Sequence, residues 1–372
     1  MALSRIPFAS VDLAVDLGTS STRICEVGEG AVLAEPSVIA LKRRSGEIAA
    51  VGRDAKEMVG RTPGSLIAIR PLAAGVIADF EMTEAMLRHF VQRLPRGRLQ
   101  RMRIAVSVAP GATAVQRRAV EKVTLAAGAH EVYVIEGPVA AAIGAGLPAD
   151  SATANLVVDV GAGSTDVAVV SLNGIVTSHS LPVAGDAMDE VLIALAEKEH
   201  GLVLGRVGAE ELKLALGSAG GAATERQLEV AGSDLVTGAP RAIALSCAEL
   251  ARALDEPVSQ IAAAVRATLE ATPPDLAHDV IKRGILLTGG GSLLAGLEDR
   301  LRREFGLPVG LAPSPLTSVV LGAARILEEL TSSGSLSPRL HASVREAHST
   351  AARVPAALSR VVSRFTPQKE SQ

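Results

Sequence analysis

Two acidic residues each end an apolar, β-branched strand and stand directly before a turn rich in Gly, Ser and Thr. Asp16 belongs to LAVDLGTSSTRICEV (residues 13–27) and Asp159 to LVVDVGAGSTDVAVV (residues 156–170). An unpaired carboxylate in a buried place is costly to desolvate, so a cation or a set of backbone donors must lie nearby. Glycine lets the backbone approach a ligand, and exposed N–H groups and Ser/Thr hydroxyls bind phosphate oxygens. Two such carboxylates with two such turns fit a polyphosphate with hydrated Mg²⁺.

The two segments share one layout, in which an apolar strand, a polar turn and a second strand recur 143 positions apart. A repeat at this spacing predicts two similar lobes, and hairpins that face each other across the lobes would enclose the polyphosphate. Ordinary hairpins, in which the Asp side chain initiates the turn, are the alternative for either segment taken alone.

A third glycine-rich segment, LLTGGGSLLAGLEDRLRREFG (residues 286–306), reads as a strand, a glycine loop and an amphipathic helix. The three glycines lack a Cβ, so a flat base and ribose can lie against them. No Lys-Ser/Thr pair follows, which excludes a P-loop. One face of the predicted helix holds four leucines: Leu293, Leu294, Leu297 and Leu301.

The composition excludes several classes of function. The 372 residues are 48% apolar but only 2% aromatic, so aliphatic side chains build the core and stacking platforms for nucleic acid are missing. The formal charge of −3 gives no electrostatic reason to expect nucleic acid as a partner. Cys25 and Cys247 form no C-x-x-C motif, and the seven histidines lack ligand spacing, so no transition-metal site is predicted. Without a long uncharged apolar run, we expect a cytoplasmic protein with at most peripheral membrane contact.

Longer stretches of the chain resemble one family. EPSVIAL, VGRDAKEMVGRTPGSLIAIRPLAAGVIADFE, AAAIGAGLP, GDAMDE and ILLTGGGSLLAGL are similar to the MreB family of bacterial actins, within the actin, Hsp70 and sugar-kinase superfamily. The resemblance covers residues 11–330. It implies a two-lobed α/β protein with the actin-like ATPase fold, each lobe a ribonuclease H-like mixed sheet flanked by helices. It also implies ATP and Mg²⁺ between the lobes. The protein would form homopolymers at the inner face of the cytoplasmic membrane and guide cell-wall synthesis proteins there.

The resemblance also implies roles for single residues. Asp16 and Asp159 would hold Mg²⁺ through water. The implied nucleotide-binding residues are Gly18, Thr19, Ser20 and Ser21 in the first turn, Gly161, Ala162, Gly163, Ser164 and Thr165 in the second, Gly185 and Asp186, the helix segment Glu210, Glu211, Leu212 and Lys213, and Gly289, Gly290, Gly291, Ser292 and Leu293 around the base.

The chain departs from the family where hydrolysis takes place. In VIEGPVAAAIGAGLP (residues 134–148), Gly137 stands where the family has the Glu that positions the attacking water. Ser164 and Asp166 likewise replace a Thr and a Glu of the second turn. Losing a water-orienting group costs orders of magnitude in rate but leaves nucleotide affinity largely intact. We therefore expect ATP binding with slow hydrolysis, and Ser164 and, if the loop shifts, Glu136 as candidate catalytic residues.

Two charged positions have open alternatives. Arg23, directly after the first turn, either reaches a phosphate or faces solvent on the edge of its strand. Glu210 and Lys213 lie three residues apart on one helical face, so they either pair with each other or point together at a ligand.

Four regions are predicted: an N-terminal segment (residues 1–10), a first lobe (11–150), a second lobe (151–330) and a flexible basic tail (331–372). Residues 88–103 contain six arginines, no acid and several apolar side chains, which favours contact with anionic lipid over an ordinary solvated loop. In the tail, residues 355–365 predict a short basic amphipathic helix that would bind the membrane together with the N-terminal segment. A disordered tail, or a helix packed on the body, is the alternative.

These features favour an ATP-binding bacterial actin homologue whose membrane-associated filaments determine cell shape by organising cell-wall synthesis. A chaperone ATPase would need a substrate-binding domain after residue 330, and the polar tail is too short for one. A sugar kinase would need a catalytic base and a sugar pocket in the first lobe, and no candidate stands out. A non-polymerising, nucleotide-dependent scaffold of the cell-wall machinery is the alternative.

Overall fold

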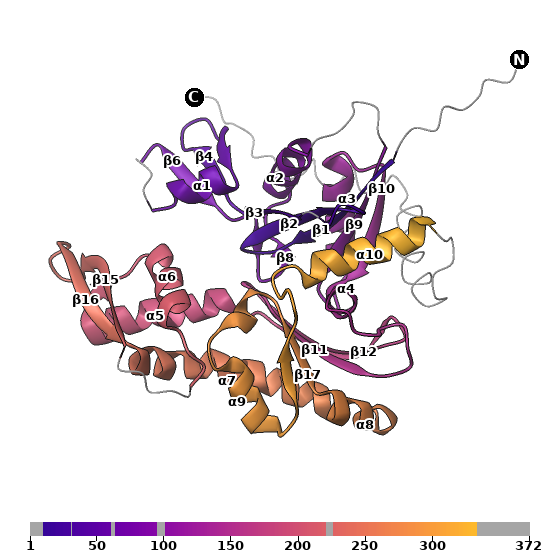
Figure 1. The fold of residues 1–372 in the computed structure, drawn as a ribbon. Coiled ribbons are helices and arrows are strands. Elements are labelled where there is room, and N and C mark those ends of the chain that lie inside the picture. The colour runs from indigo at the N-terminus through magenta and orange to yellow at the C-terminus, as the bar shows by residue number, and fades with distance from the viewer. Residues whose placement is uncertain (1–9, 31, 61–63, 95–100, 221–225, 333–372) are drawn as a thin grey trace, which may run out of the picture.

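Two five-stranded mixed sheets form the centre of the molecule (Figure 1). The computed structural model describes residues 10–332 except 31, 61–63, 95–100 and 221–225. The first sheet has the order β10-β9-β1-β2-β3, and its strands are β1 (Ser10–Leu17), β2 (Ser21–Glu26), β3 (Val32–Pro36), β9 (Arg101–Val108) and β10 (Glu131–Glu136). The second has the order β13-β12-β11-β17-β18, and its strands are β11 (Asn155–Val160), β12 (Thr165–Ser171), β13 (Gly174–Leu181), β17 (Ile285–Thr288) and β18 (Val309–Leu311).

Both sheets have the same topology. In each, three consecutive antiparallel strands are extended by two strands that run parallel to the first of them. The hairpins β1–β2 and β11–β12 therefore occupy equivalent places, and the strand, turn and strand predicted for both repeats are confirmed. We call the half built on the first sheet the first lobe and the other half the second lobe.

Two helices lie between the sheets, α4 (Gly137–Gly144) and α10 (Ser318–Ser332). The sheet faces that meet them hold small residues such as Ala14, Ala105 and Ala168, because strand alternation sends the larger side chains to the outer faces. The helices also cross closely. A Cβ added at Gly322 would collide with the carbonyl oxygen of Ala140.

The outer face of each sheet is covered by further helices. In the first lobe, α2 (Phe80–Gln92) and α3 (Ala114–Ala126) pack on it through fully buried residues that include Met86, Leu87 and Phe90. In the second lobe the core is formed with α5 (Gly185–His200), α6 (Arg206–Leu216), α7 (Cys247–Glu270), α8 (Pro274–Arg283) and α9 (Leu297–Phe305).

A small sheet extends each lobe. In the first lobe it has the order β5-β4-β6 and lies beside the short helix α1. Its elements are β4 (Ile39–Lys42), β5 (Ile48–Val51), α1 (Arg53–Met58) and β6 (Leu66–Ile69), followed by the hairpin β7 (Leu72–Ala73) and β8 (Val76–Ile77). The small sheet of the second lobe consists of β14 (Leu202–Val203), β15 (Gln227–Asp234) and β16 (Pro240–Ser246).

One sequence prediction was wrong in detail. The helix expected directly after the glycine loop is broken into a 3₁₀ turn, η1 (Gly290–Leu293), and α9. The break occurs because Gly296, with φ of 76°, adopts a left-handed conformation before α9 begins. As a result Leu297 and Leu301 are fully buried, whereas Leu293 is 50% exposed.

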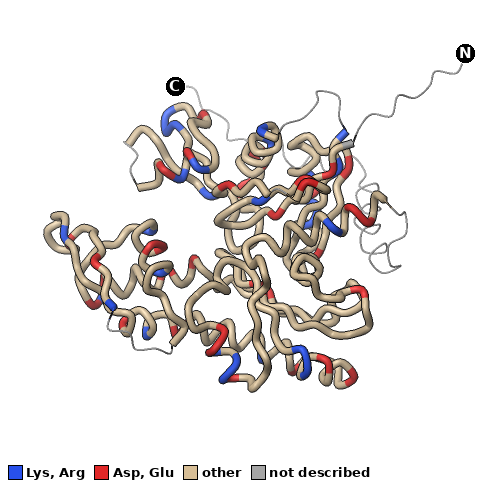
Figure 2. The backbone as a smooth tube through the Cα atoms, viewed as in Figure 1, with Lys and Arg blue, Asp and Glu red and all other residues tan. Residues whose placement is uncertain are grey.

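The predictions for the two ends of the chain and for part of the arginine-rich segment are not tested by the structure. Residues 1–9 and 333–372, with the expected helix 355–365, lie outside the described residues, as do 95–100 of the arginine-rich segment. Among the described residues, no helix is long and apolar enough to cross a membrane. Figure 2 shows acidic and basic residues interspersed over both lobes.

Candidate functional site

A cavity of about 1000 Å³ lies where the two equivalent hairpins meet. Most of the site residues predicted from the sequence line it: Asp16, Gly18, Thr19, Ser20, Ser21, Asp159, Gly161, Ala162, Gly163, Ser164, Gly185, Glu210, Lys213, Gly289, Gly290, Gly291 and Leu293. The structure therefore brings together segments from both lobes and from the glycine loop, as the repeat indicated.

Six predicted residues do not line the cavity. Thr165 donates its hydroxyl to Val183 O, Leu212 belongs to the core, Ser292 donates to Gly289 O, and Glu211 is exposed. Asp186 and Glu136 form ion pairs, described below.

The two turns are in direct contact. A Cβ added at Gly163 of the second turn would lie 2.5 Å from the hydroxyl oxygen of Thr19 and 2.9 Å from the backbone nitrogen of Ala74. One added at Gly75 would lie 2.7 Å from the hydroxyl oxygen of Ser164. Glycine is required at these places because the turns and the β7–β8 hairpin leave no room for a side chain.

Different partners hold the two turns. In the first, Ser37 donates its hydroxyl to Gly18 O at 2.7 Å, and Gly75 N donates to the Thr19 hydroxyl at 3.1 Å. The second is held by the N-terminus of α5, where Gly185 N donates to Gly161 O at 3.2 Å and Asp186 N to Ala162 O at 2.7 Å. Protein contacts from unrelated elements thus hold each turn.

The two predicted metal-binding carboxylates have unlike surroundings. Asp16 accepts a hydrogen bond from Ser107 at 3.1 Å, and its Oδ2 lies 3.7 Å from Nη1 of Arg23. Burial raises the pKa of Asp16, while Arg23 and Ser107 oppose the increase. Burial also raises the pKa of Asp159, to about 8, with added repulsion from Asp166 and Asp16, while the charge of Arg23 opposes the increase. No hydrogen bond or ion pair from another described residue stabilises the Asp159 carboxylate.

This donor set fits a hydrated divalent cation. Burial disfavours the charged forms of both cavity-lining carboxyls, and Asp16 adds repulsion at Asp159, so a divalent cation between them would stabilise their charged forms. Mg²⁺ binds oxygen ligands of this kind while keeping most of its waters. The glycine loop packs directly against this carboxylate, since a Cβ added at Gly289 would collide with Oδ1 of Asp159.

The segment around Gly137 offers no carboxylate to the cavity. Gly137 lines it, whereas the preceding Glu136 forms an ion pair with Arg117 and is not among the lining residues. A different acid does line it: Asp166, whose carboxylate accepts a hydrogen bond from Ser180. Burial raises the pKa of Asp166 to about 6, Ser180 opposes the increase and Glu136 adds to it.

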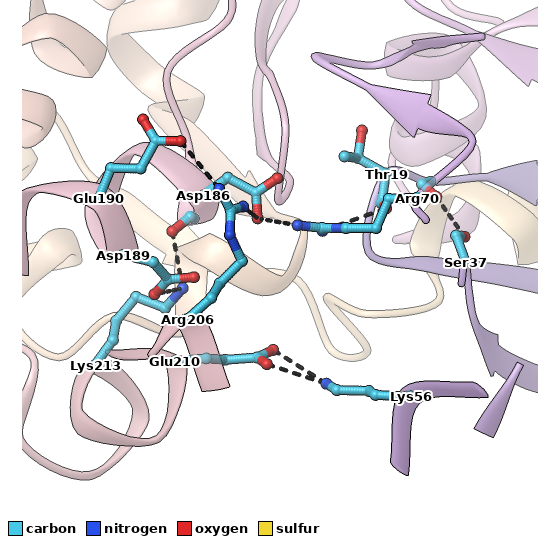
Figure 3. A network of polar contacts seen from close by, with 12 residues as sticks. Thr19, Ser37, Lys56, Arg70, Asp186, Asp189, Glu190, Arg206, Glu210 and Lys213 are labelled. Carbon is cyan, nitrogen blue, oxygen red and sulfur yellow. Dashed lines mark hydrogen bonds and ion pairs between the residues drawn. The ribbon is translucent and has the colours of Figure 1, made fainter. Parts of the chain in front are cut away.

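The open alternatives for charged residues are resolved in part (Figure 3). Glu210 and Lys213 do not pair with each other. Glu210 pairs with Lys56 of the first lobe at 3.1 Å, and Lys213 lies 2.7 Å from Asp189 and donates to Gly185 O at 2.9 Å. Arg23 lines the cavity instead of facing solvent.

Sequence reasoning missed several lining residues. Ser107 ends β9 as Asp16 ends β1, and these strands are parallel neighbours, so both side chains reach one edge of the sheet. Strand pairing would have been the signal for Ser107. Leu214 and Leu316 add exposed apolar surface to the cavity wall. For Leu214 the sequence offers one sign of such a role, an apolar residue that does not lie on the buried face of α6.

Comparisons with known proteins agree with this arrangement. The family model described as MreB/Mbl protein matches residues 10–335. The cell shape-determining protein MreB of Escherichia coli K12 is 47% identical over 331 residues, covering 87% of this chain and 95% of MreB. The cell shape-determining protein Mbl of Bacillus subtilis is 42% identical over 320 residues, covering 86% and 96% of the two chains.

Solved structures are similar to this chain over most of its length. MreB5 of Spiroplasma citri bound to AMPPNP has a TM-score of 0.83 and 31% identity, covering 87% of this chain and 98% of its own. A structure described as a MamK double helical filament, at 23% identity, shares the fold with a TM-score of 0.73, over 86% and 99% of the two chains. The expected actin-like α/β fold is confirmed, and this chain belongs to the MreB/Mbl family.

Proposed function

We propose that this chain is an ATP-binding bacterial actin that forms membrane-associated filaments and determines cell shape by organising cell-wall synthesis. The observation that supports it most is the convergence of Asp16 and Asp159, from equivalent hairpins of two lobes, on one cavity with both glycine-rich turns. MreB and Mbl relatives are named as cell shape-determining proteins, and MreB5 binds AMPPNP and ADP in its structures.

In this proposal each part of the cavity has one task. Backbone N–H groups and hydroxyls of residues 18–21 and 161–164 bind the phosphates. Asp16 and Asp159 hold Mg²⁺ through its water, and the ion neutralises charge on the phosphate oxygens. The base and ribose lie between the glycine loop and α6, where Gly290, Leu293 and Leu214 provide a surface with few polar groups. Calorimetric titration of the full chain with Mg·ATP tests this, and an absence of binding would exclude it.

We further propose that hydrolysis is slow. Gly137 offers no group to orient water, and Glu136 is already paired with Arg117. Gly137→Glu should raise the turnover of Mg·ATP by about 100-fold, the lower end of what a positioned base contributes, with little change in affinity. A Cβ at position 137 would lie 3.2 Å from Val108 O, so the backbone there must move by a few tenths of an ångström to admit it.

Gly137→Gln is the matched control, because it adds the same bulk without a carboxylate. It should leave turnover near the value of the unmodified protein. If the unmodified protein already hydrolyses ATP as fast as Gly137→Glu, the proposal of slow hydrolysis fails.

Self-assembly is the second part of the proposal. The MamK filament, whose chain shares the fold at 23% identity, supports it. Pelleting and negative-stain microscopy with ATP, ADP and a non-hydrolysable analogue test for filaments. Nucleotide binding without filaments in any of these states would favour the non-polymerising scaffold instead.

Membrane and cell-wall partners complete the proposal. Arg88, Arg93 and Arg103 of the arginine-rich segment already pair with acids of the same chain, Glu84, Glu35 and Asp12. We therefore assign contact with anionic lipid chiefly to the tail beyond residue 332 and only in part to residues 88–103. Co-sedimentation with vesicles that contain anionic lipid tests the assignment. If deletion of residues 336–372 leaves lipid binding unchanged, the tail is not the anchor.

A further inference from the structure

Arg70 lies between the two turns that face the cavity, although these turns come from different lobes (Figure 3). Its Nη2 donates to the backbone carbonyl of Thr19 at 3.3 Å, and its Nη1 donates to Oδ1 of Asp186 at 2.9 Å. Asp186 in turn donates its backbone N–H to the carbonyl of Ala162 at 2.7 Å. A continuous chain of hydrogen bonds therefore joins the first turn to the second.

The ion pair in this chain is the strongest of its contacts. The side chains of Arg70 and Asp186 are 27% and 24% exposed, and hydrogen bonds between charged groups are stronger than neutral ones. Asp186 also stands in the first turn of α5, where the helix dipole favours a carboxylate. Arg206 competes weakly for Asp186, since it lies 3.9 Å away and also pairs with Glu190.

Asp186 does not line the cavity, so its carboxylate is directed to Arg70 and not to a ligand. We propose that Arg70 and Asp186 form an interlobe tie that sets the spacing of the two phosphate turns, which makes Arg70 a positioning residue for Mg·ATP. This inference rests on the proposed nucleotide binding. It assigns Asp186 a role through Arg70 in place of the direct contact expected from the sequence.

The tie has a clear effect on binding. A polyphosphate between the lobes must contact both turns at once. When the spacing is already set, binding does not have to spend interaction energy on bringing the turns together. Without the tie the competent arrangement is populated for only a fraction of the time, and the apparent affinity falls by that fraction.

A second cross-lobe ion pair provides the matched control. Lys56 of α1 pairs with Glu210 of α6 at 3.1 Å, but the side chains are 44% and 33% exposed and neither contacts a turn. Solvent screens such a pair, so it contributes little. Lys56→Gln therefore removes an interlobe ion pair without changing the turns.

The experiment uses the full chain with Arg70→Ala, Asp186→Asn, the double variant and Lys56→Gln. Calorimetry gives the affinity for Mg·ATP, and displacement of a fluorescent ATP analogue gives its dissociation rate. We expect each single variant to bind about tenfold more weakly through faster dissociation, and the double variant to bind no more weakly than either single variant. Lys56→Gln should change affinity less than about twofold. Arg70→Lys should recover only part of the loss, because its donors all sit on one nitrogen, whereas Arg70 reaches its two partners through different nitrogens of a planar fork.

A second measurement needs no nucleotide. Amide hydrogen exchange of residues 19–21 and 161–164 in the nucleotide-free protein should speed up in Arg70→Ala and Asp186→Asn but not in Lys56→Gln, at similar melting temperatures. If Arg70→Ala weakens binding while Asp186→Asn does not, Arg70 acts on the ligand directly and the tie is refuted. Unchanged exchange in both variants also refutes it. An unmodified chain that fails to bind Mg·ATP would refute the proposed function, and the exchange data would still decide on the tie.

Discussion

The two hairpins that face the cavity have the same backbone arrangement but differ in charge at one equivalent position. Strand register pairs Asp16 with Arg23 in the first hairpin and Asp159 with Asp166 in the second. Burial raises the pKa of both carboxyls, to about 8 for Asp159, and the charge of Arg23 opposes the increase at both, whereas Asp166 adds to the increase at Asp159. The first hairpin thus places a cation opposite its carboxylate, and the second places another acid there. The repeat preserves the backbone geometry, while one register position differs in charge between the lobes.

The turns differ in a second way. Side chains and the β7–β8 hairpin hold the first turn, and the backbone at the start of α5 holds the second. The second turn therefore moves with α5, and with α5 it depends on the contact between Asp186 and Arg70. Equivalent turns in the two lobes are fixed by unrelated parts of the sequence.

The largest expected effect comes from removing the carboxylate that lacks a partner in the chain. Asp159→Asn should weaken binding of Mg·ATP by about 100-fold, and Asp16→Asn by about tenfold, the range found for groups that act on a metal through its shell. Asp159→Asn should lose more because Arg23 already offsets the charge of Asp16. Calorimetry with and without Mg²⁺ measures both. Equal losses would show that the charge difference between the hairpins has no consequence for binding.

A smaller effect is expected from the contact between the hairpins. Gly163→Ala places a Cβ against the Thr19 hydroxyl and the Ala74 backbone, so the turns must separate. Overpacking of this kind costs about 1 to 3 kcal/mol of unfolding free energy. Gly174→Ala, at the start of β13, has its nearest neighbour 3.7 Å from the new atom and should change stability by less than about 0.5 kcal/mol. Denaturant unfolding of the two variants compares them, and equal stability would show that the turns are not packed as described.

The smallest effect concerns pH. The pKa of Asp159 is higher in the folded than in the unfolded chain, so the folded state binds the proton more tightly between pH 4 and about 8. Its contribution to stability is present at low pH and is lost as pH rises through about 8. The melting temperature of the nucleotide-free, magnesium-free protein should therefore fall by a few degrees from pH 6 to pH 8.5.

Asp159→Asn should flatten this pH dependence, and Asp16→Asn should flatten it as well, since burial raises the pKa of both carboxyls. Added Mg²⁺ should raise the melting temperature more at pH 8.5 than at pH 6. A profile of Asp159→Asn that matches the unmodified protein would mean that this carboxyl titrates normally.

Local patterns in the sequence were sufficient for the parts of the site that are short and repeated. Both hairpins and the glycine loop after β17 could be predicted because apolar strands, Gly/Ser/Thr turns and acidic strand ends are local signals. The break before α9 could not, because a left-handed Gly296 and a helix interior look alike in an apolar periodicity.

Ion pairs between residues far apart in the chain could not be predicted from the sequence, for a different reason. Glu210 and Lys213 are ideally spaced to pair on α6, yet each bonds a residue that only the tertiary fold brings near, Lys56 and Asp189. No local sequence signal distinguishes Arg70 from other arginines of the chain. The role proposed for it depends on the position of Asp186, 116 residues later. Charge partners across lobes are set by topology and not by spacing.

The position of α10 has a consequence for biosynthesis. This helix is the last described element, yet it packs on the inner face of the first sheet, against Ala14 and Ala105, and crosses α4 at Gly322. The N-terminal half of the chain therefore cannot cover its inner face until residues 318–332 have left the ribosome. Until then the small apolar residues of that face lack the helix that covers them in the folded chain.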